Sequence, residues 1–101
     1  MQGDLISPHE VRLLLVFRHS PEQWLDNGQV AEAATISPRT ARLHTAKLAK
    51  LGVIDMQRVF PATKFRLGQK PGEDGLAYLD RWENAREAHG ITHAAVAEPG
   101  Q

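Results

Sequence analysis

The stretch that decides the fold is ISPRTARLHTAKLAKLGVI, residues 36–54. Ser37 followed by Pro38 is a helix-start pattern, because the serine hydroxyl caps a free backbone N–H and proline suits the first helical position. Gly52 follows the last apolar residue, where a left-handed C-cap belongs. Between these limits apolar residues recur at spacings of three and four, which predicts a helix over residues 38–51. The inward stripe of this helix comprises Ala41, His44 or Thr45, Leu48 and Leu51.

Two more helix starts precede this stretch. A serine, a proline and a glutamate in the order of a capping box predict a helix over residues 8–18. An aspartate followed by glutamine three residues later predicts a second helix over residues 27–34. Only the three residues 35–37 separate this helix from the next, and a connection this short fixes two helices at a steep angle.

The residues after the third helix have the composition of β-strands. Residues 53–60 and 63–67 are rich in β-branched and aromatic side chains, and the Pro-Ala between them predicts a hairpin. The remaining expected elements are a short edge strand at 23–25, a loop at 68–75 and a fourth helix at 76–89.

Length and composition indicate one domain. A chain of 101 residues is long enough for one core and too short for two. We expect residues 1–90 to form this domain and residues 91–101, which show no periodicity, to be a disordered tail. The absence of cysteine excludes disulfides and thiolate zinc sites. The sequence shows neither a signal peptide nor an apolar run of membrane-spanning length, so we expect a cytoplasmic protein that does not contact membranes.

The formal net charge is zero, but the charges are unevenly distributed. Residues 1–36 hold two basic and five acidic side chains, and residues 67–101 hold three basic and six acidic ones. Residues 37–66, in contrast, hold seven basic side chains and one acidic side chain. A basic block of this kind is typical of a surface that meets an anionic partner. The alternative is that these side chains only solvate an exposed helix and hairpin, and charge alone leaves both open.

The order of these elements resembles the winged helix-turn-helix superfamily of DNA-binding proteins. The resemblance is carried by DNGQVAEAA (26–34), ISPRTAR (36–42) and LAKLGVI (48–54), and it extends over roughly residues 7 to 68. MarR-like, ArsR-like, and plasmid or phage regulators share this pattern, and no single family is favoured. Two departures stand out. Thr45 occupies an inner position where a large aliphatic residue is expected, and the hairpin tip at 60–63 is short and uncharged.

The resemblance implies a mainly α fold with a small β-hairpin: a three-helix core, a wing and a C-terminal helix. It also implies a sequence-specific regulator of transcription that binds double-stranded DNA. Helix 38–51 would enter the major groove as the recognition helix, and hairpin 53–67 would lie along the backbone. The candidate DNA-binding residues are Ser37, Pro38, Arg39, Thr40, Arg42, Leu43, Lys47, Lys50, Arg58, Lys64 and Arg66.

These candidates differ in the role that their chemistry allows. Arg39 and Arg42 can pair bidentately with guanine, and the remaining cations would contact phosphate. Ser37 is most simply an N-cap whose neighbouring backbone N–H groups also suit a phosphate. Leu43 is either an ordinary exposed leucine or a contact to a thymine methyl group.

The last predicted helix leaves a choice between two roles. Tyr78, Leu79, Trp82 and Ala85 form its apolar stripe, which would either close the core of one chain or form the interface of a homodimer; we expect the homodimer. His89 and His93 have a metal-ligand spacing but no carboxylate or cysteine partner, so we expect no metal and no cofactor.

Other functions find less support in the sequence. It contains no Gly-x-Ser-x-Gly, no phosphate-binding glycine loop and no His-Glu-x-x-His, so we do not expect an enzyme. The main alternative to DNA binding is a winged-helix protein–protein interaction module, which the neutral total charge would suit. A third possibility is a small-molecule sensor, although no effector can be named from the sequence.

Overall fold

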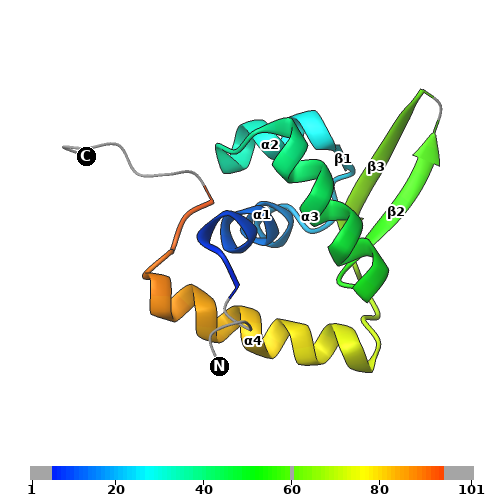
Figure 1. The fold of residues 1–101 in the computed structure, drawn as a ribbon. Coiled ribbons are helices and arrows are strands. Elements are labelled where there is room, and N and C mark those ends of the chain that lie inside the picture. Colours follow the sequence, from blue (N-terminus) through cyan, green and yellow to red (C-terminus); the bar gives the residue numbers. More distant parts are fainter. Residues whose placement is uncertain (1–5, 60, 95–101) are drawn as a thin grey trace.

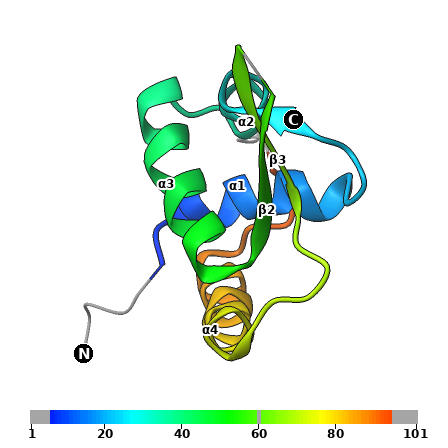
Figure 2. The same ribbon diagram turned by 90° about the vertical axis from the view of Figure 1, so that its right-hand side faces the viewer.

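The computed structural model describes residues 6–59 and 61–94. Its helices and strands, in chain order, are α1 (Pro8–His19), β1 (Leu25–Asp26), α2 (Asn27–Ala34), α3 (Pro38–Leu51), β2 (Ile54–Val59), β3 (Ala62–Leu67) and α4 (Glu73–His89). The predicted fold class, mainly α with a small hairpin, is therefore confirmed. In both Figure 1 and Figure 2, α1 lies in the middle of the molecule, between α2 and α3 on one side and α4 on the other.

The caps predicted for the first three helices are present. The side chains of Ser7 and Ser37 accept hydrogen bonds from backbone N–H groups three residues ahead, and Asp26 forms a complete capping box with Gln29. Gly52 ends α3 with φ of 80°, a left-handed conformation that glycine adopts without strain. The predicted bounds of α2 and α3 are those observed.

The strands form one antiparallel sheet in the order β1-β3-β2. In the hairpin, Ile54 pairs with Leu67 and Met56 with Phe65, and β1 pairs Leu25 with the same Phe65. The predicted edge strand at 23–25 is thus observed slightly later, at residues 25–26. The hairpin extends beyond the helices as a projecting wing beside α3 (Figure 2).

The hydrophobic core lies where α1 meets the other elements. Val11, Leu13, Leu14 and Phe17 of α1 are all fully buried, as the nearly continuous apolar sequence of this helix requires. Helix α4 crosses α1 and contributes Trp82, whose indole Nε1 donates a hydrogen bond to the carbonyl oxygen of Val11 at 3.3 Å. The terminal helix therefore belongs to the core of the single chain.

The first turn of α4 differs from the prediction. The sequence predicts loop through Gly75, but α4 already begins at Glu73, and Gly75 is buried within it. A Cβ at position 75 would lie only 2.8 Å from the carbonyl oxygen of Leu51. Glycine is therefore needed here because the first turn of α4 packs against the backbone at the end of α3, a contact that loop composition does not reveal.

The predicted tail at 91–101 begins with residues that are anchored. Ile91 and Ala94 pack against the hydrophobic core, and the backbone N–H of Ile91 donates to the carbonyl oxygen of Arg86 at 3.1 Å. Residues 95–101 lie outside the described part of the chain. Of the helices that the structure describes, none combines the length and apolarity needed to span a bilayer.

Candidate nucleic-acid interface

The outward face of α3 carries cations around an apolar centre. Arg39, Leu43, Ala46 and Lys50 follow one another at helical spacing, and all four are exposed. A hollow of about 490 Å³ on this face is lined by Arg39, Thr40, Arg42, Leu43 and Ala46. None of the residues of α3 is acidic. This surface therefore offers guanidinium donors with no carboxylate on the same helix to neutralise them.

The N-terminus of α3 is held by its own side chains. The hydroxyl of Ser37 accepts a hydrogen bond from the backbone N–H of Thr40 at 3.1 Å and donates one to the Thr40 hydroxyl at 2.9 Å. Pro38 follows as the first helical residue. This end of a helix carries a partial positive charge, which adds to the charge of Arg39. Ser37 is thus an N-cap in the structure, and its contact with DNA stays a prediction.

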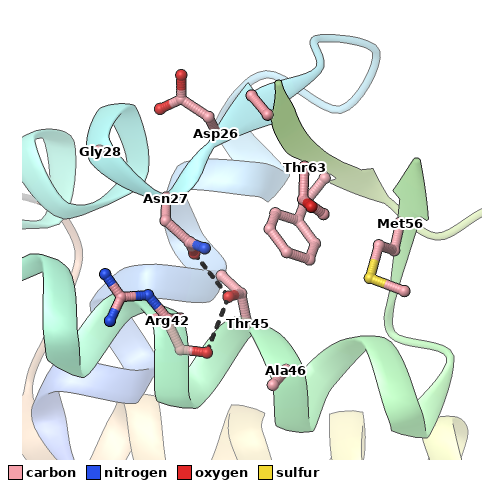
Figure 3. Close-up of a pocket in the computed structure, with 10 residues that line it drawn as sticks. Asp26, Asn27, Gly28, Arg42, Thr45, Ala46, Met56 and Thr63 are labelled. Atoms are coloured by element: carbon pink, nitrogen blue, oxygen red, sulfur yellow. Dashed lines mark hydrogen bonds between the residues drawn. The ribbon is translucent and has the colours of Figure 1, made fainter. Parts of the chain in front are cut away.

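A second hollow, of about 470 Å³, lies between the start of α2, the middle of α3 and the hairpin (Figure 3). Its lining is formed by Asp26, Asn27, Gly28, Arg42, Thr45, Ala46, Met56, Ala62, Thr63 and Phe65. Because Arg42 and Ala46 line both hollows, the outward face of α3 continues without interruption toward the hairpin.

A buried hydroxyl fixes α2 against α3 beside this second hollow. Thr45 is fully buried, and its hydroxyl donates a hydrogen bond to Oδ1 of Asn27 at 2.7 Å (Figure 3). The carbonyl oxygen of Arg42 is a second, longer neighbour of that hydroxyl, at 3.2 Å. The polar residue at this inner position of α3 is therefore explained, since it bonds the first residue of α2.

Arg58 lies on the side of the hairpin that faces α3. Residues directly opposite in an antiparallel pair share one face of the sheet, and the faces alternate along each strand. Arg58 is paired with Thr63, and its neighbour two residues back, Met56, is paired with Phe65. Because Met56, Thr63 and Phe65 line the hollow beside α3, Arg58 shares their side of the sheet. Arg58 can therefore meet the same partner as α3.

Lys64 and Arg66 belong to the opposite face of the sheet. They pair with Gln57 and Asp55, whose side chains alternate with those that face α3. The guanidinium carbon of Arg66 lies 4.5 Å from the centroid of the Trp24 ring, a cation–π contact. The structure therefore does not bring these two predicted residues together with the cations of α3.

Lys47 is bound to a buried carboxylate of its own chain. Its ammonium group lies 3.1 Å from Oε2 of Glu10, a side chain of α1 that is only 4% exposed. Nδ1 of His44 lies 3.2 Å from the other carboxylate oxygen, and the hydroxyl of Tyr78 donates a hydrogen bond to Glu10. Lys47 thus joins α3 to α1, which the sequence does not predict.

The environment of Glu10 keeps it ionised. Burial by itself raises the pKa of this carboxyl group, but hydrogen bonds from His44, Tyr78 and Lys47 outweigh the effect and lower the pKa to about 2. Burial, together with the neighbouring carboxylate, raises the pKa of Tyr78, so that its phenol stays protonated as a donor. The charge of Lys47 is consequently balanced within the protein.

Three of the four residues predicted for a dimer contact are already buried in one chain. Tyr78, Trp82 and Ala85 are 0%, 1% and 3% exposed, and only Leu79 is partly accessible. These three side chains close the core, the alternative that the sequence left open. A dimer through α4 would have to use its other face, and dimerisation itself stays a prediction.

The sequence does not suggest four residues that line the hollow beside α3: Asn27, Ala46, Met56 and Thr63. Met56 and Thr63 could have been found from strand alternation once the pairing was known, whereas the role of Asn27 depends on a contact with α3. Among the described residues, no group of three or more histidines, aspartates or glutamates is placed to hold a metal ion.

Comparison with known proteins identifies the fold. No protein-family model matches the chain, and no curated protein matches its sequence. The structure of the YusO protein from Bacillus subtilis aligns with a TM-score of 0.60 at 15% identity, over 89% of this chain and 62% of that chain. TubR, a type III plasmid segregation protein, aligns with a TM-score of 0.50 at 18% identity, over 78% of this chain and 87% of that one.

The chain has a winged helix-turn-helix fold. In the vocabulary of this fold, α2 and α3 are the helix-turn-helix, and hairpin β2–β3 is the wing. At such low identity the similarity shows the fold alone, and the chain spans less than two thirds of the YusO chain.

Proposed function

We propose that this winged helix-turn-helix is a sequence-specific, double-stranded DNA-binding regulator of transcription. The observation that carries the proposal is the outward face of α3, where Arg39, Arg42 and Lys50 are exposed and no residue of the helix is acidic. Duplex DNA carries one negative charge per about 1.7 Å of its axis, so a face of this kind gains free energy by releasing counterions. The helix would enter the major groove, with the wing on the flanking backbone.

The proposal gives the side chains two kinds of role. Arg39 and Arg42 border the hollow on α3 and would pair bidentately with guanine, which specifies sequence. Lys50 and Arg58 would contact phosphates, which positions the protein without specifying sequence. Lys47 has a smaller part than the sequence suggests, because Glu10 already balances its charge. Lys64 and Arg66 also have a smaller part than the sequence suggests, because they lie on the face of the hairpin that is turned away from α3.

We also propose that the regulator acts as a homodimer on DNA in the cytoplasm. Two copies related by a two-fold axis would place two recognition helices on half-sites about one helical turn apart. The measurement is sedimentation equilibrium of the free protein and of its complex with duplex DNA. A monomer in both would remove this part of the proposal and leave DNA binding itself untouched.

A protein–protein interaction module is the second candidate function. It is favoured by the zero net charge and by the large apolar side chains near α3, since Leu43 is 69% and Met56 is 49% exposed. Such side chains together suit a protein partner as well as a base edge. The two candidates differ in how binding responds to salt.

The deciding experiment is the binding of the protein to mixed-sequence duplex DNA at several salt concentrations. With about four phosphate contacts, the association constant should fall roughly a hundred-fold between about 50 and about 200 mM monovalent salt. Absence of binding at low salt, or binding that does not depend on salt, would favour the interaction module. Selection of preferred sites from random duplexes would then test whether binding depends on sequence.

A further inference from the structure

The centre of the outward face of α3 is apolar although its borders are cationic. Leu43 is 69% exposed, which is the highest value among the large apolar side chains of the described residues. The exposed Ala46 follows it on the same stripe, and both line the hollow that Arg39 and Arg42 border. A single exposed leucine needs no explanation by itself. A leucine and an alanine that line one hollow with two arginines form a surface with a defined chemical preference.

The chemistry of the major groove supplies one matching group. Arginine recognises the acceptor edge of guanine, and the one apolar group that the four natural bases display in this groove is the 5-methyl of thymine. An aliphatic side chain next to arginine therefore suits a thymine near a guanine. Charge complementarity favours DNA over an apolar peptide here, because Arg39, Arg42 and Lys50 surround the apolar centre without any carboxylate on α3.

We propose that Leu43, supported by Ala46, is a specificity-determining residue that packs against the 5-methyl group of a thymine. This inference rests on the proposed DNA-binding function and names the base that the apolar centre recognises. Leu43 follows Arg39 by four residues, which is about 6 Å along a helix axis. At a rise of about 3.4 Å per base pair, a helix that lies in the major groove would place this thymine within about two base pairs of the guanine that Arg39 contacts.

The test removes the methyl group from the DNA and the leucine from the protein. The best duplex obtained by selection with the wild-type chain is prepared with each thymine replaced in turn by uracil, which lacks only the methyl group. One thymine in each bound site should then show about a four-fold loss of affinity, the value expected for one methyl group removed from an apolar contact. Leu43→Ala should bind the uracil and thymine duplexes equally well.

Leu76→Ala is the matched control, because Leu76 is also exposed, at 59%, but lies on α4. This variant should keep the full uracil penalty. Far-ultraviolet circular dichroism of both variants should match the wild type, since neither side chain is buried.

The outcomes separate the two proposals. The inference alone is overturned if the protein binds DNA in a salt-dependent way but no replacement of thymine by uracil lowers the affinity. It is also overturned if that binding shows no preferred sequence. A uracil penalty of equal size in Leu43→Ala and wild type also overturns it. Absence of salt-dependent DNA binding overturns the proposed function and the inference together. Loss of a dimer in Leu43→Ala, without any uracil effect, would assign the hollow to a second copy of the chain.

Discussion

The ammonium group of Lys47 on α3 lies 3.1 Å from the carboxylate of Glu10 on α1, and this ion pair connects α3 to the central helix of the molecule. Glu10 is 3% exposed as a residue, so its charge needs partners, and His44 and Tyr78 supply two more. Three elements of the fold, α1, α3 and α4, meet at this one carboxylate. A lysine that the sequence assigns to DNA is therefore also part of the framework that orients α3.

Replacing Lys47 should lower stability more than replacing another lysine of the same helix. Lys47→Ala leaves Glu10 with fewer partners and should reduce the free energy of unfolding by about 1–3 kcal/mol. Lys50→Ala, which removes an exposed lysine, should change it by less than about 0.5 kcal/mol. Urea denaturation at neutral pH measures both. Equal stability of the two variants would show that the ion pair contributes little.

Acid should weaken the fold through Glu10. The pKa of this group is lowered from 4.5 to about 2, so its contribution to stability is complete above pH 4.5 and is lost as the pH falls toward 2. The shift corresponds to at most about 3 kcal/mol. Urea denaturation at several pH values between 4.5 and 2 should show that the wild type and Glu10→Gln become more similar in their free energy of unfolding as the pH falls. A constant difference would mean that Glu10 titrates normally in the folded protein.

The hydrogen bond between Thr45 and Asn27 should contribute measurably to the packing of α2 on α3. Thr45→Val keeps the shape of this fully buried side chain but removes the hydroxyl, at a cost of about 1 kcal/mol. A double-mutant cycle with Asn27→Ala isolates the interaction. If the two substitutions have additive effects on the free energy of unfolding, measured by urea denaturation, the contribution of the Thr45 hydroxyl to stability does not depend on Asn27.

The sequence predicts features that local chemistry controls and misses those that depend on distant contacts. Ser37, Pro38 and Gly52 define both ends of α3 without reference to the rest of the chain, and those ends are observed. Glu10 and Lys47, in contrast, are 37 residues apart, and only the packing of α1 on α3 brings them together. A cation that contacts phosphate and a cation that neutralises a buried carboxylate look alike in the sequence. The basic block therefore does not reveal that Lys47 pairs with Glu10.

Gly75→Ala should destabilise the protein although alanine is the better helix former. In the interior of an exposed helix, replacing glycine by alanine raises the free energy of unfolding by about 1 kcal/mol. Here the added Cβ would lie 2.8 Å from the carbonyl oxygen of Leu51 and 2.9 Å from Cβ of Pro71, so α4 would have to move, at a net cost of about 1–3 kcal/mol. Gly72→Ala is the steric control, because its Cβ would meet no atom within 4 Å, and the loss of the glycine N-cap of α4 should cost less than about 1 kcal/mol. A melting temperature of Gly75→Ala equal to or above that of the wild type would contradict the close packing of α4 against the end of α3.

Three arginines distinguish the proposed interface from the rest of the basic block. Arg39→Ala should weaken binding to a selected site by about 1–3 kcal/mol and relax the preference for one base. Arg58→Ala should weaken binding to all sequences alike and reduce the slope of the salt dependence by about one. Arg66→Ala should leave DNA binding nearly unchanged, because its guanidinium lies over the Trp24 ring on the far face of the hairpin.

Fluorescence anisotropy with specific and random duplexes, each titrated at several salt concentrations, measures all three variants together. The comparison is informative because each of the three Arg→Ala substitutions removes one positive charge. Any difference in DNA affinity among the variants therefore arises from the position of the arginine. Equal losses for the Arg39 variant on specific and random DNA would remove its role in reading bases. An Arg66 variant that binds as weakly as the Arg58 variant would place the far face of the hairpin against the DNA as well, and the orientation proposed for the wing would have to be revised.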